Sequence, residues 1–304
     1  MTARWPDSIS IIERGWLSSN TIVCRGEQPA IIDSGYVSHA ALGVEVVRRA
    51  LDGEQPRLLV NTQLHSDHCG GNAALQAAWP GIETRVPSPS FDAARRWDAD
   101  ALTFEACGQE CAPFRVDAAF APGEQLLLGD LEFEALAAPG HDPQMMVLWC
   151  EHERILVSAD ALWEDGFGVI FPEIEGEPGF DDLRATLQMI EGLDAALVIP
   201  GHGAPFADLG SALDRAYGRL AHFEADPTRH ARHALKVLVK FLLMDRGQLS
   251  LDELTARLTA MRYAREINER FLQVPDAQLA AWIATSLIKS GVARLDGATL
   301  HDVP

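Results

Sequence analysis

The sequence predicts an α/β protein in which two sheets with outer helices are followed by a smaller, mostly helical part. Three observations predict this fold class. Strand-like and helical patterns alternate over residues 8–199, helical patterns are nearly continuous after residue 206, and the charge changes at the same point. Residues 1–206 carry 12 arginines, no lysine and 32 acidic residues, whereas residues 207–304 carry 13 basic and 12 acidic residues. We therefore expect two domains, 1–206 and 207–304.

Apolar runs indicate the strands of the first part, and apolar residues at helical spacing indicate its helices. Strands are expected at 8–14, 17–24, 30–33, 57–61, 84–86, 125–128, 131–137, 145–150, 155–157 and 196–199. Helices are expected at 39–51, 69–78 and 181–193. Because strands and helices alternate early and strands cluster later, the pattern favours two sheets with helices on their outer faces.

After residue 206, apolar residues recur at helical spacing with few interruptions. Helices are expected at 211–224, 229–245, 251–260, 264–271 and 276–290, and short strands at 292–295 and 299–303. This order is winged-helix-like. The helix at 277–290 is mainly apolar and carries Lys289 as its base, whereas a DNA-reading helix needs several basic or amide side chains. We expect it to serve packing or dimerisation, which leaves a homodimer open.

The composition excludes several classes of protein. With 304 residues, 47% hydrophobic, and no run of 18 apolar residues, the chain is expected to fold in solution. Residues 1–6 lack the layout of a signal peptide, so we expect a cytoplasmic protein. The five cysteines predict reduced thiols, with a pair or metal site at Cys107 and Cys111 left open. A net charge of −19 disfavours nucleic-acid and membrane partners and favours a substrate that is neutral, cationic or small.

Four polar motifs follow four apolar strands, each in the loop where the strand ends. They are Gln63-Leu64-His65-Ser66-Asp67-His68, Pro139-Gly140-His141-Asp142, Ser158-Ala159-Asp160 and Pro200-Gly201-His202-Gly203. Strands of one sheet layer can bring such loops to one rim. Imidazole and carboxylate groups suit zinc and its neighbours, whereas oxygens alone suit calcium or magnesium. A lone histidine is usually structural, but this set predicts a metal site.

Residues 62–71 resemble the HxHxDH signature of the metallo-beta-lactamase superfamily, with Gln63 in place of the first histidine. His141, Asp160 and His202 follow in that family's order and spacing, and the resemblance covers about residues 8–206. It implies a four-layer αββα sandwich. The order of elements after residue 206 also resembles the small winged-helix domain that some relatives carry at this end.

The resemblance implies two neighbouring metal sites joined by a bridging carboxylate. The ligands would be His65, His141 and Gln63 for the first ion, Asp67, His68 and His202 for the second, and Asp160 as the bridge. A neutral amide oxygen is a weaker zinc ligand than an imidazole nitrogen. The first site is therefore expected to be looser than the second, in an active rather than a dead enzyme.

The implied function is a zinc-dependent hydrolase with one or two ions, with iron and manganese left open. A metal-bound hydroxide would attack a carbonyl carbon, and Asp67 would orient the water and accept a proton. A bridging Asp160 is similar to the glyoxalase II, lactonase and phosphodiesterase branches, so a small ester, thioester or lactone is the expected substrate. Asp33 matches a carboxylate that orients a ligand by hydrogen bonding, with a simple turn aspartate as the alternative.

Two other functions stay in view. Phosphodiester or RNA cleavage occurs in some winged-helix-bearing relatives, and a metal-binding regulator that binds DNA is the second. The acidic balance of residues 1–206 and the base-poor helix argue against both.

Segments 88–115 and 161–180 are expected to shape the substrate pocket. The second segment brings aromatic residues either into that pocket or into the core: Trp163, Phe167, Phe171 and Phe180.

Overall fold

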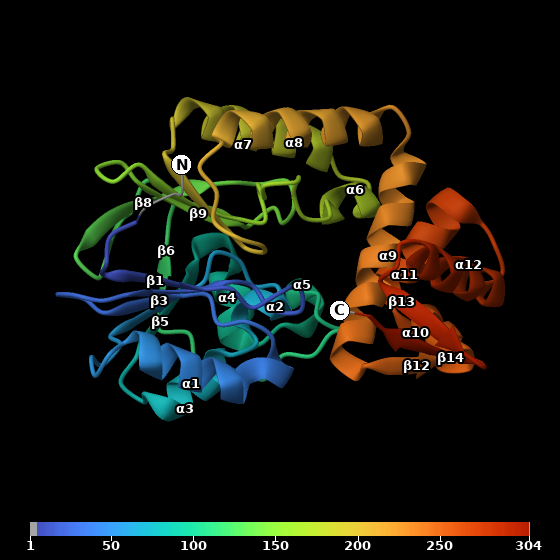
Figure 1. Ribbon diagram of the computed structural model, residues 1–304, viewed down its shortest axis with the longest axis horizontal. Helices are drawn as coiled ribbons and strands as arrows, with labels where there is room; N and C mark the ends of the chain where they lie inside the picture. The colour runs from blue at the N-terminus through green and yellow to red at the C-terminus, as the bar shows by residue number, and fades with distance from the viewer. Residues whose placement is uncertain (1–4, 304) are drawn as a thin grey trace.

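Two mixed sheets face each other and helices cover their outer faces in the structure, a computed structural model (Figure 1). This arrangement confirms the predicted α/β sandwich with its helical C-terminal region. The structure describes residues 5–303. Residues 1–4, on which the expectation about a signal peptide partly rests, and residue 304 lie outside the described residues.

The first sheet has the order β1-β2-β3-β4-β5-β6, antiparallel up to β3 and parallel from there on. Its strands are β1 (Ile9–Ile12), β2 (Thr21–Cys24), β3 (Ala30–Ile32), β4 (Leu58–Val60), β5 (Glu83–Pro87) and β6 (Ala118–Phe120). The strand predicted at 17–24 begins only at Thr21. The preceding residues form a buried loop instead, because Ser19 N donates to Asp67 O and Asn20 N donates to Gly201 O.

The second sheet has the order β11-β10-β9-β8-β7 and is antiparallel except between β10 and β11. Its strands are β7 (Gln125–Leu128), β8 (Leu131–Ala137), β9 (Met146–Cys150), β10 (Ile155–Ala159) and β11 (Leu197–Pro200). The helices of this part are α1 (Ala40–Ala50), α2 (Ser66–Cys69), α3 (Asn72–Ala78), α4 (Phe91–Arg96), α5 (Ala99–Leu102), α6 (Phe171–Glu175), α7 (Gly179–Gly192) and α8 (Leu209–Glu224), with short turns η1 (Val37–His39) and η2 (Ser88–Ser90). The single helix predicted at 69–78 is thus two helices.

Three apolar cores hold the four layers together. Val47 of α1 and Leu75 of α3 pack against Leu59 on the outer face of the first sheet. The space between the sheets is filled from both sides by side chains such as Val60 and Phe133. On the other face of the second sheet, α7 and α8 bury a third core, with the helices drawn above the sheet in Figure 1. Burial of this apolar surface is the main stabilising contribution.

The C-terminal part has its own core and a small antiparallel sheet of order β12-β14-β13. Its elements are α9 (Pro227–Arg246), β12 (Gln248–Ser250), α10 (Leu251–Ala260), α11 (Arg262–Ile267), η3 (Asn268–Leu272), α12 (Asp276–Lys289), β13 (Ala293–Asp296) and β14 (Thr299–Asp302). Strand β12 is absent from the sequence-based expectation, since three residues leave no periodic signal. A capping box between Ser250 and Glu253 starts α10 directly after it.

The change of core falls between α8 and α9. Leu213 and Leu220 of α8 pack with α7, whereas Leu235 and Leu242 of α9 pack with the C-terminal helices. The division at residue 206 and the winged-helix classification stay predictions. Helix α12 buries its apolar side in the C-terminal core. None of the helices among residues 5–303 has both the length and the apolar character needed to cross a membrane.

Candidate metal centre

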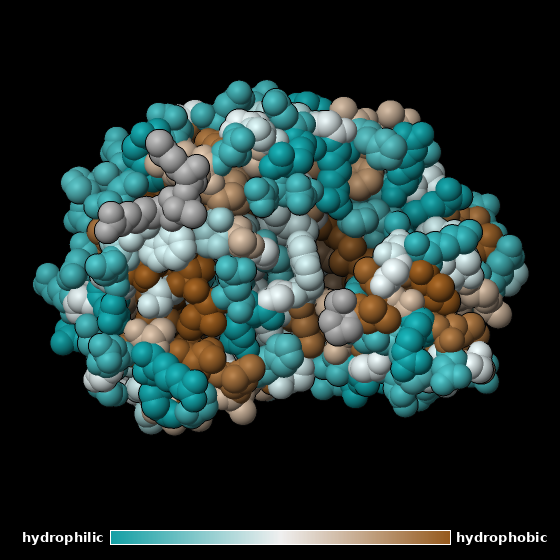
Figure 2. Space-filling view, in the orientation of Figure 1, coloured by the Kyte–Doolittle hydropathy of each residue, from teal (hydrophilic) through white to brown (hydrophobic). Residues whose placement is uncertain are grey.

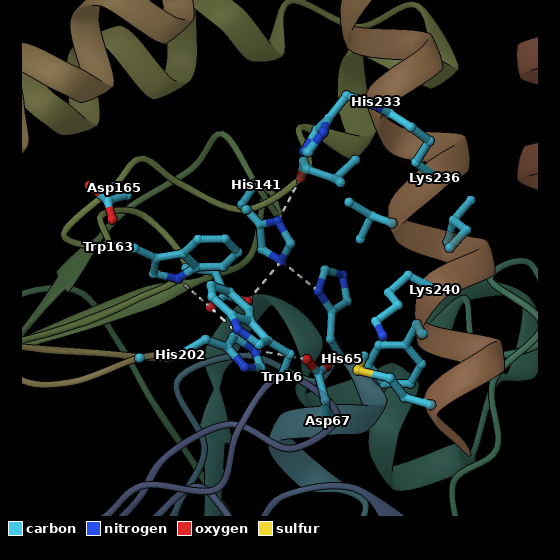
Figure 3. Close-up of a pocket in the computed structure, with 18 of the residues that line it drawn as sticks. Trp16, His65, Asp67, His141, Trp163, Asp165, His202, His233, Lys236 and Lys240 are labelled. Carbon is cyan, nitrogen blue, oxygen red and sulfur yellow. Dashed lines mark hydrogen bonds and ion pairs between the residues drawn. The ribbon is translucent and has the colours of Figure 1, made fainter. Parts of the chain in front are cut away.

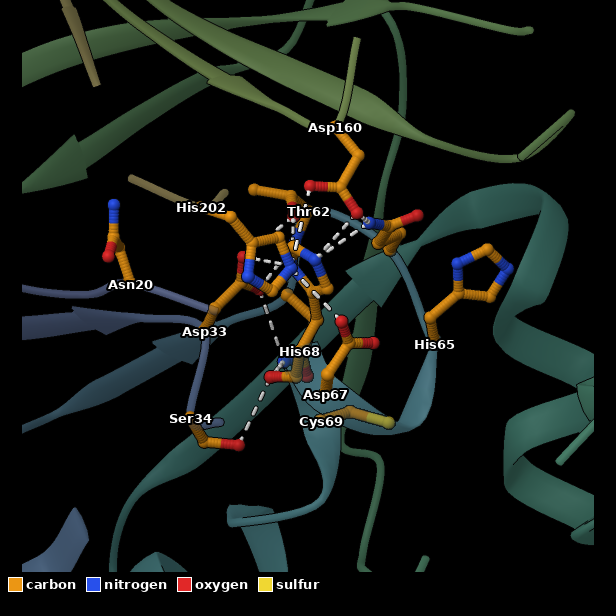
Figure 4. A network of polar contacts seen from close by, with 12 residues as sticks. Asn20, Asp33, Ser34, Thr62, His65, Asp67, His68, Cys69, Asp160 and His202 are labelled. Carbon is orange, nitrogen blue, oxygen red and sulfur yellow. Dashed lines mark hydrogen bonds and ion pairs between the residues drawn. The ribbon is translucent and has the colours of Figure 1, made fainter. Parts of the chain in front are cut away.

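The structure brings all seven predicted ligands to one rim of the two sheets. They follow β4, β8, β10 and β11 in loops, except for two in the short helix α2: Gln63, His65, Asp67, His68, His141, Asp160 and His202. In Figure 4 the side chains of Asp160, Asp67 and His202 surround that of His68, while His65 stands apart. Residues more than a hundred positions apart along the chain thus form one polar site.

Four of these side chains form a tight cluster, which we call the second cluster because it contains the ligands predicted for the second ion. One donor atom from each of Asp67, His68, Asp160 and His202 lies within 4.8 Å of the others. His68 Nε2 is 3.1 Å from Asp160 Oδ2, and His202 Nε2 is 3.1 Å from Asp67 Oδ2. Two imidazole nitrogens and two carboxylates make a donor set suited to one divalent transition-metal ion.

The outer nitrogens of three histidines are held by oxygen acceptors. His68 Nδ1 donates to Asp33 Oδ2 at 2.8 Å, His141 Nδ1 to Val169 O at 2.5 Å, and His202 Nδ1 to Gly15 O at 3.3 Å. Each contact turns the inner Nε2 toward the centre, as in histidines that bind metal ions. Asp33 also accepts hydrogen bonds from Thr62 N and Thr62 Oγ1, so it is an orienting carboxylate rather than a simple turn aspartate.

Two histidines and an amide lie where the first metal site is predicted. His65 Nδ1 lies 2.8 Å from His141 Nε2. The fully buried Gln63 donates from Nε2 to Asp160 Oδ2 at 2.8 Å, an orientation that the Asp160 charge favours over its reverse. Its Oε1 is buried and has no hydrogen-bond partner among the described residues. A buried amide oxygen without a partner fits a cation, and together with His65 and His141 it offers fewer strong donors than the second cluster.

The pKa shifts of the second cluster also indicate that it would stabilise a bound cation. Burial alone would raise the pKa of Asp160, but the charges of His68 and His202 hold it well below its ordinary value. Burial alone would lower the pKa of His68, but the carboxylates of Asp160 and Asp33 raise it well above its ordinary value. The cluster therefore stabilises a positive charge at its centre, in the position that a metal ion would take.

The backbone around Asp160 is adapted to this crowding. Ala159, directly before it, has a φ of 46°, in the left-handed region that most residues avoid, and β10 is bulged at this point. A Cβ atom on Gly201 would stand 2.2 Å from Asp160 Oδ1, and one on Gly168 would stand 2.4 Å from His141 Nδ1. Only glycine allows these two close approaches, which explains both positions in physical terms.

A cavity of about 700 Å³ opens from the cluster toward α9. Both predicted segments contribute to its wall, the first through Cys107 and Gln109 and the second through residues around Trp163. The four aromatic residues of segment 161–180 have different places. Trp163 and Phe171 line the cavity, whereas Phe167 and Phe180 are buried in the core. Figure 2 shows an apolar hollow between the two-sheet part and the C-terminal helices.

Two tryptophans flank the cluster: Trp163, which the sequence placed in either the pocket or the core, and Trp16, which the sequence analysis missed. Trp163 Nε1 donates to Asp160 Oδ1 at 3.0 Å. Trp16 stacks on the His202 ring with a centroid distance of 5.6 Å, contacts Trp163 edge-on, and is 56% exposed. An exposed tryptophan at a cavity mouth is a surface on which apolar substrate groups pack.

Helix α9 is tied to the loop that carries the support of His141. Ile170 N donates to His230 Nε2 at 3.1 Å, and His230 is buried. Burial and then the charge of Arg219 lower the pKa of His230 to about 4, so the ring stays neutral and accepts this bond. The neighbouring Val169 O holds His141. Because Val169 O and Ile170 N belong to the same peptide unit, that unit links His230 of the C-terminal part to the candidate ligand His141.

The five cysteines are free thiols, including Cys107 and Cys111. The sulfur atoms of Cys69 and Cys111 lie 3.8 Å apart.

The model of the Metallo-beta-lactamase superfamily matches residues 14–202 of the chain. A hydroxyacylglutathione hydrolase of Anaeromyxobacter dehalogenans (strain 2CP-C) is 30% identical over 214 residues, which cover 67% of this chain and 71% of the relative. The residues matched by the family model, 14–202, include every predicted metal ligand.

Two solved structures share the fold. A metallo-beta-lactamase family protein from Thermus thermophilus superposes with a TM-score of 0.57 at 20% identity, covering 97% of this chain and 98% of that one. The protein TTHA1623, solved in a di-iron-bound form, gives a TM-score of 0.54 at 23% identity, covering 68% and 98%. At these identities the comparison establishes the fold alone, and in the first case it extends over the C-terminal part.

Proposed function

The chain belongs to the metallo-beta-lactamase superfamily, and from this premise we propose that it is a metal-dependent hydrolase of a small thioester, with esters and lactones as related substrates. The observation that carries the proposal is the buried cluster of Asp67, His68, Asp160 and His202 at the end of a substrate-sized cavity. The relative named hydroxyacylglutathione hydrolase favours a thioester among the carbonyl substrates.

We assign the second metal site to Asp67, His68 and His202, and the first to His65, His141 and Gln63, with Asp160 between them. The chemistry supplied by a bound divalent cation is a lower pKa for a water molecule and polarisation of a substrate carbonyl. Zinc is the proposed metal because of the nitrogen-rich donor set, and iron and manganese are the alternatives.

Asp67 is the proposed base. Its carboxylate lines the cavity, and its Oδ2 lies 3.1 Å from His202 Nε2. Burial alone would raise the pKa of Asp67, but the hydrogen bond from His202 and the charge of His68 lower it, so the carboxylate is ionised at neutral pH. In this position Asp67 orients the attacking water and accepts its proton at a carboxylate oxygen.

Substrate binding is assigned to the apolar and aromatic wall. Trp16 and Trp163 flank the second cluster, and Phe171 packs edge-on against His65 with a centroid distance of 5.3 Å. These rings exclude water from the acyl group of the substrate and hold its scissile carbonyl near the two proposed metal sites. A cavity of about 700 Å³ accepts a substrate larger than a simple acyl ester.

The proposal is tested with four substrates measured side by side: an acyl thioester, a lactone, an aryl ester and a phosphodiester. Each is assayed with the purified protein before and after dialysis against a chelator, and again after zinc is restored. We expect the thioester to be hydrolysed fastest, the activity to vanish on chelation, and zinc to restore it. Turnover of the phosphodiester in preference to all three carbonyl substrates contradicts the proposal, as does thioester turnover that chelation leaves unchanged.

A further inference from the structure

The cavity wall opposite His65 and His141 is basic. Helix α9 contributes His233, Lys236 and Lys240 to it, and α8 contributes Arg219. Figure 3 shows the three α9 side chains along the helix, across the cavity from His65 and His141. The three α9 residues belong to the C-terminal part, whereas Arg219 lies on α8, which packs with α7 on the two-sheet part.

Lys240 is already neutralised within the chain. Its Nζ pairs with Asp302 Oδ1 at 2.6 Å and donates to the carbonyl oxygens of Val292 and Val303. Three oxygen acceptors use its three donors, so Lys240 fixes the end of the chain against α9 and has no donor left for a ligand.

Unlike Lys240, Arg219 and Lys236 have no carboxylate partner among the described residues. Within residues 5–303, no carboxylate oxygen lies within 4.0 Å of either side-chain charge. Arg219 stacks over Phe167 and Phe223, and it donates to His233 Nε2 at 2.7 Å and to Asp165 O at 3.5 Å. Burial, followed by the charge of Arg219, lowers the pKa of His233 to about 3, so the ring is neutral and accepts this bond. A half-buried guanidinium without a counter-ion favours the binding of an anion.

The carboxylates elsewhere in the cavity do not neutralise this wall. Asp67 and Asp160 belong to the candidate metal centre. Asp165 stands at the rim with a side chain 88% exposed and pairs with Arg215, while Glu164 is exposed beside it. Apolar side chains of α9, including Val237 and Phe241, also line the cavity.

We propose that Lys236 and Arg219 form a binding site for the anionic end of the substrate, a carboxylate or a phosphate joined to the scissile thioester by an apolar or neutral linker. This inference rests on the proposed function, because it concerns the same cavity. It reverses the expectation from composition that a neutral, cationic or small substrate fits best. Residues 1–206 are acidic overall, but the far end of the substrate would meet Lys236 of α9 and Arg219 of α8.

The test measures binding of non-hydrolysable thioethers to the full-length, zinc-loaded protein by calorimetry. One pair is S-butyl pantetheine 4′-phosphate and neutral S-butyl pantetheine, and the other is N-(3-butylsulfanylpropanoyl)glycine and its glycinamide. We expect the anionic member of at least one pair to bind about tenfold more tightly than its neutral partner, because charge-assisted hydrogen bonds are the stronger ones. The pair that shows the preference distinguishes phosphate from carboxylate.

Variants assign the preference to the wall. Lys236→Gln is expected to remove most of the preference and Lys236→Glu to remove it entirely, while Lys289→Gln, at an exposed lysine of α12 outside the cavity lining, keeps it. Equal affinities within both pairs overturn the proposal, and so does a Lys236→Gln variant that keeps the full preference. Because thioethers are not hydrolysed, failure of this site and failure of the proposed hydrolysis are measured separately.

Discussion

Replacing Asp160 with asparagine is expected to lower kcat/KM for the thioester by about a thousandfold, because metal ions contribute several kcal/mol to such reactions and each 1.4 kcal/mol is about a factor of ten. Both oxygens of Asp160 accept hydrogen bonds, Oδ1 from Trp163 Nε1 and Oδ2 from Gln63 Nε2. An asparagine offers an acceptor to only one of these donors and turns an NH₂ group toward the other. The variant also loses the charge that faces His68 and His202.

The measurement pairs steady-state thioester hydrolysis with the zinc content of the same preparation. We expect both to fall in Asp160→Asn while the thermal transition stays cooperative. Asp52→Asn is the matched control, since the Asp52 side chain is 83% exposed and the residue lies in the turn after α1, outside the cavity lining. Asp160→Asn with wild-type zinc content and wild-type kcat/KM contradicts the role given to Asp160.

Gln63→His is expected to raise the number of tightly bound zinc ions per chain from about one to about two, because a histidine nitrogen is the stronger zinc donor. In the wild-type protein the buried amide gives its donor to Asp160 and presents only Oε1, which lacks a hydrogen-bond partner among the described residues. His65 and His141 are the two imidazoles assigned to the first site, whereas His68, whose Nε2 lies 2.8 Å from Gln63 Nε2, is assigned to the second. The second cluster already has four donors and gains nothing from the change.

Zinc per chain is measured after gel filtration in metal-free buffer. Gln63→Asn serves as the control, since its shorter amide cannot extend as far and should leave one ion per chain. Equal zinc content in wild type and Gln63→His refutes the account of a weak first site. Two ions in the wild type refute it as well.

That the seven candidate ligands lie together could be predicted from the sequence because its signals are local, while their role as metal ligands stays a prediction. Each of His65, His141, Asp160 and His202 follows an apolar strand, and loops at the ends of neighbouring strands meet at one rim. The two-sheet fold could be predicted for the same reason, since strand and helix periods are read within a few residues. The resemblance to a family then assigned roles to positions that spacing alone leaves open.

The rest of the site depends on packing across long sequence separations. Trp16 lies in a loop whose place is set when Asn20 Nδ2 donates to Pro200 O, 180 positions away. Lys236 reaches the cavity because α9 docks on the first part, where Phe241 packs edge-on against Tyr36 at 5.1 Å. Helical periodicity shows that α9 has an apolar face but not which surface that face covers. No local pattern encodes either contact.

The most direct test of the central claim is a zinc titration of the metal-free protein with thioester hydrolysis as the readout. We expect no activity without metal, a first rise that is complete at one equivalent as the second cluster fills, and a further rise only in excess zinc as the weaker first site loads. Activity in the metal-free protein contradicts the claim that the reaction depends on the metal. A single step that ends at two equivalents contradicts the claim that the two sites differ.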